Sequence, residues 1–137
     1  MEDDRKICFI GYKRLSDMAR AILSRPEFAE ILLVDSDVDQ LHNVIDEATA
    51  GGCEVFVAGS GNAAEFRRYS GAPLIELKVR LIDYFLAVRK ALQLGKSPVV
   101  VLYRYSESIR SEDLSRLFDT PIKCITYQSS EELLKKL

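Results

Sequence analysis

The sequence has no excess of positive charge, no long apolar run and no clustered cysteines. Its 19 basic and 21 acidic residues give a formal charge of -2. It lacks the basic surplus that neutralises a phosphate backbone, so we expect no direct nucleic-acid binding by this segment. No apolar run approaches the roughly 18 residues that span a bilayer. The acidic start, Met1–Asp4, is not a basic and apolar leader. We therefore predict a soluble cytoplasmic protein with no membrane partner.

Metal and catalytic motifs are also scarce. The three cysteines, Cys8, Cys53 and Cys124, form no C-x-x-C motif, and the only histidine, His42, lies in an unrelated helical stretch. We therefore predict no metal site and no cofactor, and the cysteine spacing suits a reducing compartment. The chain also lacks a G-x-S-x-G motif and a histidine-acid cluster, the usual apparatus of nucleophilic and general-base catalysis. These absences favour a binding module over an enzyme.

What the chain does have is an alternation of short apolar runs and amphipathic stretches. This pattern is typical of βα units around a parallel sheet, as in flavodoxin-like or periplasmic-binding-like lobes. The length of 137 residues and the hydrophobic content of 47% suffice for a buried core. The expected strands are Ile7–Gly11, Ile31–Val34, Glu54–Ala58, Leu74–Leu77, Val99–Arg104 and Ile122–Tyr127. Helices are expected over 16–24, 36–50, 63–69, 80–94 and 111–118, with a last one capped by Ser129 and Glu132.

The pattern restarts after the turn Gly95–Pro98, which predicts two lobes. The first, residues 1–95, has four strands, whereas the second, residues 96–137, has only two and is expected to be incomplete. Either a chain boundary or a partner chain that supplies the missing edge would explain this. The helix expected over 80–94 has a broader apolar face than one sheet requires, so we also expect a homo-oligomer such as a dimer.

The segment Gly59–Asn62, between a strand and a helix, is the most specific motif in the chain. Its two glycines allow a ligand to approach the backbone closely, and the helix expected from Ala63 points free N–H groups at the same spot. Loops that follow parallel strands converge at one edge of the sheet. We predict that a small carboxylate or phosphate binds there, the alternative being a simple tight turn. The residues expected to hold it are Tyr12, Lys13, Ser60, Gly61, Asn62, Ala63 and Arg80.

Other interpretations of these loops are open. Gly59–Ala64 satisfies a relaxed dinucleotide fingerprint, so the NAD-binding domain of an oxidoreductase is the alternative function, although the motif follows the third strand. Val34–Asp37 is similar to the acidic site of a phosphoacceptor receiver domain. No aspartate closes the strand where a receiver needs one, so Ser36, with Asp39, is expected to cap a helix. A purely structural dimerisation domain is the third possibility.

Several stretches resemble one known family, the N-terminal sensory domain of propionate-catabolism-activator-type regulators that work with sigma-54. The resemblance spans nearly the whole chain. In the family's glycine loop an arginine and a threonine are replaced here by Ser60 and Asn62, and Leu81–Ile82 replaces a glycine-aromatic pair. The matching stretches are Ile31–Asp46, Cys53–Glu65, Ala72–Val79 and Asp83 with the helix that follows it.

The resemblance implies an effector-sensing domain in two α/β lobes with a cleft between them. In the full-length protein it implies a following AAA+ ATPase, which engages sigma-54 RNA polymerase, and then a helix-turn-helix domain. For the propionate member the effector is 2-methylcitrate, a tricarboxylate. The resemblance also adds Asp83 to the expected ligand-binding residues. We therefore expect a sensor of an anionic metabolite that controls the attached domains.

Overall fold

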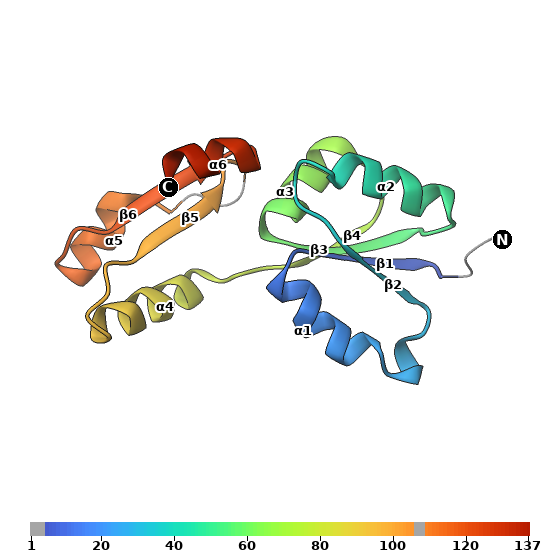
Figure 1. The fold of residues 1–137 in the computed structure, drawn as a ribbon, viewed down its shortest axis with the longest axis horizontal. Helices are drawn as coiled ribbons and strands as arrows, with labels where there is room; N and C mark the ends of the chain where they lie inside the picture. The colour runs from blue at the N-terminus through green and yellow to red at the C-terminus, as the bar shows by residue number, and fades with distance from the viewer. Residues whose placement is uncertain (1–4, 106–108) are drawn as a thin grey trace. The chain divides into compact units, whose positions relative to one another are not determined.

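The computed structural model describes residues 5–105 and 109–137, and the acidic start Met1–Asp4 lies outside the described residues. The chain divides into two compact units, Met1–Leu77 and Lys78–Leu137. Each unit has its own parallel sheet with helices packed on it, which confirms the predicted α/β class. The elements of both units are labelled in Figure 1.

The first unit is a four-stranded parallel sheet in the order β2-β1-β3-β4. The four strands are β1 (Ile7–Gly11), β2 (Ile31–Asp35), β3 (Val55–Gly59) and β4 (Leu74–Leu77). The helical elements are α1 (Arg14–Leu23), the short 3-10 helix η1 (Pro26–Phe28), α2 (Leu41–Ala50) and α3 (Ser60–Tyr69). Helix α1 ends before Pro26, whose ring cannot continue a helix.

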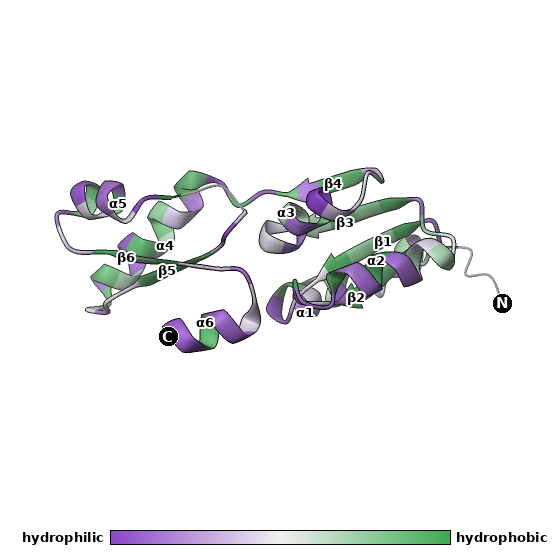
Figure 2. Ribbon diagram, turned by 90° about the horizontal axis from the view of Figure 1, so that it is seen from above, coloured by the Kyte–Doolittle hydropathy of each residue, from purple (hydrophilic) through white to green (hydrophobic). Residues whose placement is uncertain are grey.

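The core of the first unit lies between the sheet and the pair α2 and α3. These two helices cover one face of the sheet and α1 covers the other (Figure 1). Phe56 of β3 packs against Phe66 of α3 with ring centroids 4.9 Å apart, and Ile10 and Leu41 are fully buried beside them. In Figure 2 the strands are mainly apolar, whereas the helices alternate apolar and polar residues. This is the pattern of buried strands under amphipathic helices.

The second unit is a two-stranded parallel sheet with three helices. Its strands are β5 (Val99–Tyr103) and β6 (Lys123–Tyr127), and its helices are α4 (Leu81–Gln93), α5 (Ser111–Phe118) and α6 (Ser130–Lys136). One buried cluster joins the two strands to α4 and α5; its members are Val88, Val100, Leu102, Leu114 and Ile122. The described residues thus form one sheet of four strands and one of two, as the sequence predicts.

The boundary between the two units falls after Leu77 along the chain, whereas the sequence analysis places it at Gly95. The difference arises from α4. Its Val88 is 3% exposed and shares a core with Val100 and Leu114, so the helix belongs with the strand that follows it. The Val88 side of the wide apolar face predicted from the sequence therefore has a partner within its own unit, whereas Leu81, Ile82 and Leu86 are exposed.

Helix α2 begins at Leu41, five residues after the helix start predicted at Ser36. The Ser36 hydroxyl donates to the Asp37 carbonyl at 2.9 Å, and Asp37 Oδ1 accepts the Gln40 N–H at 3.0 Å. Ser36 therefore caps no helix, and the capping box predicted for Ser36 and Asp39 is wrong. Ser36 is 2% exposed, and its N–H and carbonyl bond to Gly11 and Asn62, which local sequence does not reveal.

Candidate functional site

The strand order reverses between the carboxyl ends of β1 and β3, the position at which an open parallel sheet has its binding crevice. From β1 the chain turns through α1 to β2 on one side, and from β3 it turns through α3 to β4 on the other. Helices α1 and α3 leave toward opposite faces of the sheet (Figure 1). In an open parallel sheet, such a reversal of strand order is where ligands bind. The two turns beside it are adjacent, since a Cβ built on Gly59 would lie 3.5 Å from Leu15 Cδ2.

The turn after β1 has a strained backbone at Lys13. This residue has φ 45° and ψ -110°, a conformation that L residues rarely adopt. Its N–H donates to Asp35 Oδ1 at 2.8 Å, and the buried Ser16 hydroxyl donates to the same oxygen at 2.5 Å. The carboxylate at the end of β2 thus holds the turn after β1 in place.

Lys13 and Tyr12 bring a positive charge and an aromatic ring to this turn. The Lys13 Nζ lies 5.1 Å from the centre of the Tyr12 ring, and both side chains are exposed. Contact with the Tyr12 hydroxyl raises the pKa of the Lys13 ammonium, with smaller contributions from Asp35 and Asp37. Lys13 is therefore charged at neutral pH and accessible to an anion.

The turn after β3 is also strained, at Ser60, where φ is 44°. Helix α3 begins at Ser60, not at Ala63 as predicted, so the glycine motif forms the first turn of the helix. Gly59 is the N-cap and has no side chain to offer, and the first N–H groups of a helix have no partner within it. The N–H groups of Ser60 and Gly61 thus lie at the positive end of the helix dipole, where Ser60 is exposed and Gly61 is buried.

Asn62 and Ala63 lie inside the fold. The Asn62 side chain is 8% exposed, and its amide donates to the Ser36 carbonyl at 2.8 Å. Ala63 is fully buried in the core under α3. The Asn62 amide, predicted to contact a ligand, is therefore already engaged with the loop after β2.

Arg80 and Asp83 belong to the second unit and pair with each other at the start of α4. Asp83 Oδ2 accepts the Arg80 N–H at 2.9 Å, and its Oδ1 lies 3.2 Å from Arg80 Nη2. These contacts lower the pKa of Asp83, with the Arg80 side chain as the largest cause, and raise that of Arg80. Both residues stabilise the first turn of the helix, as acidic groups near a helix start do.

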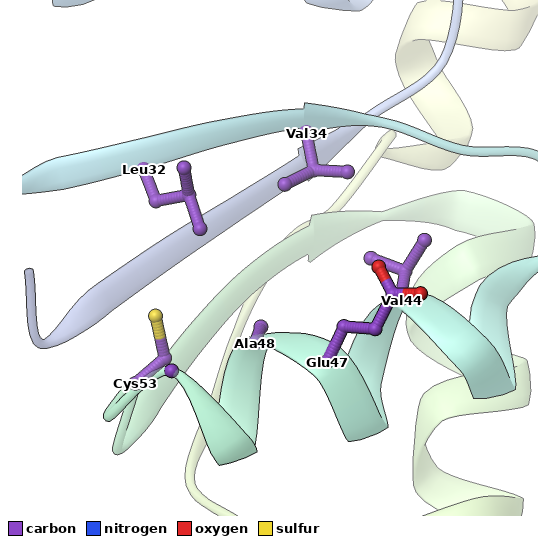
Figure 3. Close-up of a pocket in the computed structure, with 7 residues that line it drawn as sticks. Leu32, Val34, Val44, Glu47, Ala48 and Cys53 are labelled. Carbon is purple, nitrogen blue, oxygen red and sulfur yellow. The ribbon is translucent and has the colours of Figure 1, made fainter. Parts of the chain in front are cut away.

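A separate apolar pocket opens between β2 and α2, away from the crevice (Figure 3). Its volume is about 170 Å³, and Glu47 is the charged residue in its wall. Figure 3 shows Leu32 and Val34 on the strand opposite Ala48 and Cys53. The pocket walls contain none of the predicted ligand-binding residues.

Two further properties hold for the part of the chain that the structure describes. No group of three or more His, Cys, Asp or Glu side chains there could hold a metal ion. None of its helices is both long enough and apolar enough to traverse a bilayer.

Sequence reasoning missed the two residues that tie the crevice together. The sequence analysis compares Asp35 with the acidic site of a receiver domain but does not include it among the ligand-binding residues, and it does not single out Ser16. The signal for Asp35 was available, because it directly ends a buried strand, where polar groups of an α/β sheet converge. Ser16 carries no such signal, since a serine in a helix is ordinarily exposed.

The fold defines a class, the parallel α/β units whose strand order reverses within the sheet. The particular family follows from the sequence. Residues 26–137 match the model of the propionate catabolism activator family, and the chain belongs to that family of regulatory sensor domains. No curated protein matches the chain.

A solved structure shares this fold. A crystal structure of an NtrC family transcriptional regulator from Clostridium acetobutylicum superposes with a TM-score of 0.67 at 15% sequence identity. The match covers 95% of this chain and 70% of that one. At this identity the likeness establishes the fold, including the arrangement of its parallel strands.

Proposed function

We propose that the chain is the effector-sensing domain of a transcriptional activator in the cytoplasm and that a small anionic metabolite binds in the crevice between β1 and β3. The contacts would come from Lys13 and Tyr12 on one side and from the N–H groups of Ser60 and Gly61 on the other. Binding would alter the attached AAA+ and helix-turn-helix domains that act with sigma-54 RNA polymerase. The domain senses its ligand and performs no chemistry on it.

The observation that carries this proposal is the pairing of two strained turns at one crevice. Lys13 and Ser60 both have positive φ, at 45° and 44°, and each stands where a helix starts after one of the two strands at the reversal. Backbone strain of this kind persists where the structure holds it in place and clusters at ligand sites. A charged lysine and the start of a helix suit carboxylate or phosphate.

Ligand-induced thermal stabilisation tests the proposal. The 137-residue chain is titrated with 2-methylcitrate, citrate and inorganic phosphate. A ligand at about 100 times its Kd stabilises the folded protein by about 2.7 kcal/mol. We expect Lys13→Met to weaken binding about tenfold, the size expected for losing one hydrogen bond to a charged group.

Lys6→Met is the matched control, because Lys6 is an exposed lysine at the opposite end of β1 whose ion pair with Glu54 contributes little to stability. It should leave binding unchanged. Equal losses in the two variants would mean that the anions act through general charge, and no stabilisation by any of the anions would contradict the proposal. Saturable binding of NADH would favour the dinucleotide-binding alternative.

A further inference from the structure

The dipeptide Asp35-Ser36, at the end of β2, contacts both turns of the crevice. Both residues of the dipeptide bond to the turn after β1. The Asp35 carboxylate accepts the Lys13 N–H at 2.8 Å and the Ser16 hydroxyl at 2.5 Å, and the Ser36 N–H donates to the Gly11 carbonyl at 2.8 Å. Three hydrogen bonds thus tie two consecutive residues to one short turn.

The contact with the turn after β3 runs through Asn62. Its Nδ2 donates to the Ser36 carbonyl at 2.8 Å from the first turn of α3, two residues after the strained Ser60. The Ser36 N–H bonds to Gly11 and the Ser36 carbonyl bonds to Asn62, so Ser36 links these two residues. Strand β2 is not hydrogen-bonded to β3, since β1 lies between them. This side-chain bond is thus a direct tie across β1.

The part of the network formed by Ser16, Ser36 and Asn62 is buried, whereas Asp35 and Lys13 are exposed to solvent. Ser16, Ser36 and Asn62 are 1%, 2% and 8% exposed, and no buried side-chain nitrogen or oxygen among the described residues lacks a partner. A buried polar group that loses its partner is costly, so such networks favour one geometry. A shift of either turn would strain its hydrogen bonds to Asp35-Ser36, the dipeptide that the other turn also contacts.

We propose that Asp35 and Asn62 are positioning residues that couple the two turns, so that the backbone at Lys13 and at Ser60 changes conformation together. The role of this coupling in sensing rests on the proposed function, because a ligand held by one turn would then order the other. The coupling itself is independent of any ligand and can be measured without one.

Amide spectra and hydrogen exchange of the 137-residue chain test the coupling. In Asp35→Ala the amide resonances of Ser60, Gly61 and Asn62 should shift, although the described hydrogen bonds of Asp35 go to Lys13 and Ser16. In Asn62→Ala the Lys13 N–H should exchange about tenfold faster, the size expected for a weakened hydrogen bond to a charged group. The double variant should show less than the sum of the two changes.

Two further variants separate positioning from general stability. Asp35→Asn keeps an oxygen that can accept from Lys13 and Ser16, so it should restore most of the native pattern in both turns. Ile45→Val loosens the same core without touching the network and should leave the amides of Lys13 and Ser60 unchanged. Effects confined to each variant's own turn, and additive in the double variant, would overturn the coupling. They would leave the anion-binding proposal standing, as that is read from ligand titration.

Discussion

Gly11 shows how one residue shapes the crevice. It ends β1, and a Cβ built there would lie 2.6 Å from Ser16 Oγ and 3.1 Å from the Ser16 backbone. Ser16 is fixed in turn by its bond to Asp35. Only the absence of a side chain at Gly11 lets α1 start so close to the strand, which brings its first turn to the crevice.

Substitution of Gly11 should therefore cost stability. We expect Gly11→Ala to lower the free energy of unfolding by about 2 kcal/mol, because neighbouring backbone must move to admit the methyl group. Gly71→Ala is the control, since nothing lies within 4 Å of a Cβ built there. It should change stability by less than about 0.5 kcal/mol. Urea denaturation measures both, and equal effects would show that the space around Gly11 is not limiting.

At the scale of secondary-structure elements, helices α2 and α3 are joined by several polar contacts on their outer side. The His42 ring stacks on the Tyr69 ring with centroids 3.9 Å apart, and its Nε2 lies 2.8 Å from Glu65 Oε1. Arg68 pairs with the other Glu65 oxygen at 2.8 Å, and the Tyr69 hydroxyl donates to the Asp46 carboxylate. These contacts hold the outer faces of the two helices together.

The Tyr69 contact predicts a dependence of stability on alkaline pH. The hydrogen bond to Asp46 is the largest cause of a raised pKa of Tyr69. A raised pKa in the folded state means that the stabilisation is complete below the ordinary tyrosine value, near 10.0, and is lost as pH rises through the higher folded value.

Urea denaturation of the wild type and Tyr69→Phe from pH 7 to pH 11.5 measures this dependence. The wild type should be the more stable below pH 10, and its advantage should shrink at higher pH. Asp46→Asn should weaken the pH dependence while keeping the ring stack. A difference between wild type and Tyr69→Phe that stays constant over this range would contradict the assignment.

Helix starts show why some local patterns predict structure and others do not. The cap predicted for Ser129 and Glu132 is confirmed: the Ser129 hydroxyl accepts the Glu132 N–H at 3.2 Å, and Glu132 accepts the Gln128 N–H at 2.9 Å. All partners there lie within four residues. The same pattern at Ser36 does not form a helix cap. The Ser36 N–H bonds to Gly11 and its carbonyl bonds to Asn62, and both partners come from distant parts of the chain.

In the whole molecule, the two units have separate cores. Ile45 and Phe56 belong to the cluster under α2 and α3, whereas Val88 and Leu114 belong to the cluster around β5 and β6. The assignment of α4 to the second unit therefore has a direct consequence for local stability.

Truncation in one core should loosen only the unit that contains it. We expect Val88→Ala to cost about 2 kcal/mol and to speed amide exchange in β5 and β6, while β1 to β4 keep their protection. Ile45→Ala, in the first core, should give the reverse pattern with a cost of about 3 kcal/mol. Hydrogen exchange resolved by residue measures both. Loss of protection in β1 to β4 on Val88→Ala would place α4 with the first unit, as the sequence interpretation had it.

The sequence by itself determined the elements, because each depends on neighbours along the chain. The alternation of apolar runs predicted six strands, and all six lie at or within two residues of the expected positions. The motif Gly59–Asn62 was placed correctly at the end of a strand, and the resemblance to the propionate catabolism activator family is confirmed over residues 26–137.

Only the tertiary structure decided which turns face each other and what the polar groups there do. Periodicity does not say that β1 and β3 are neighbours, so the sequence placed Lys13 and Ser60 in one site only because loops after parallel strands converge, and the strand order shows that their turns are adjacent. A hydrogen bond across the sheet ties Asn62, which the sequence predicts as a ligand contact, to the Ser36 carbonyl. Burial of Val88 likewise moved α4 to the second unit. Each of these depends on contacts between residues far apart in sequence, whose energies no local pattern records.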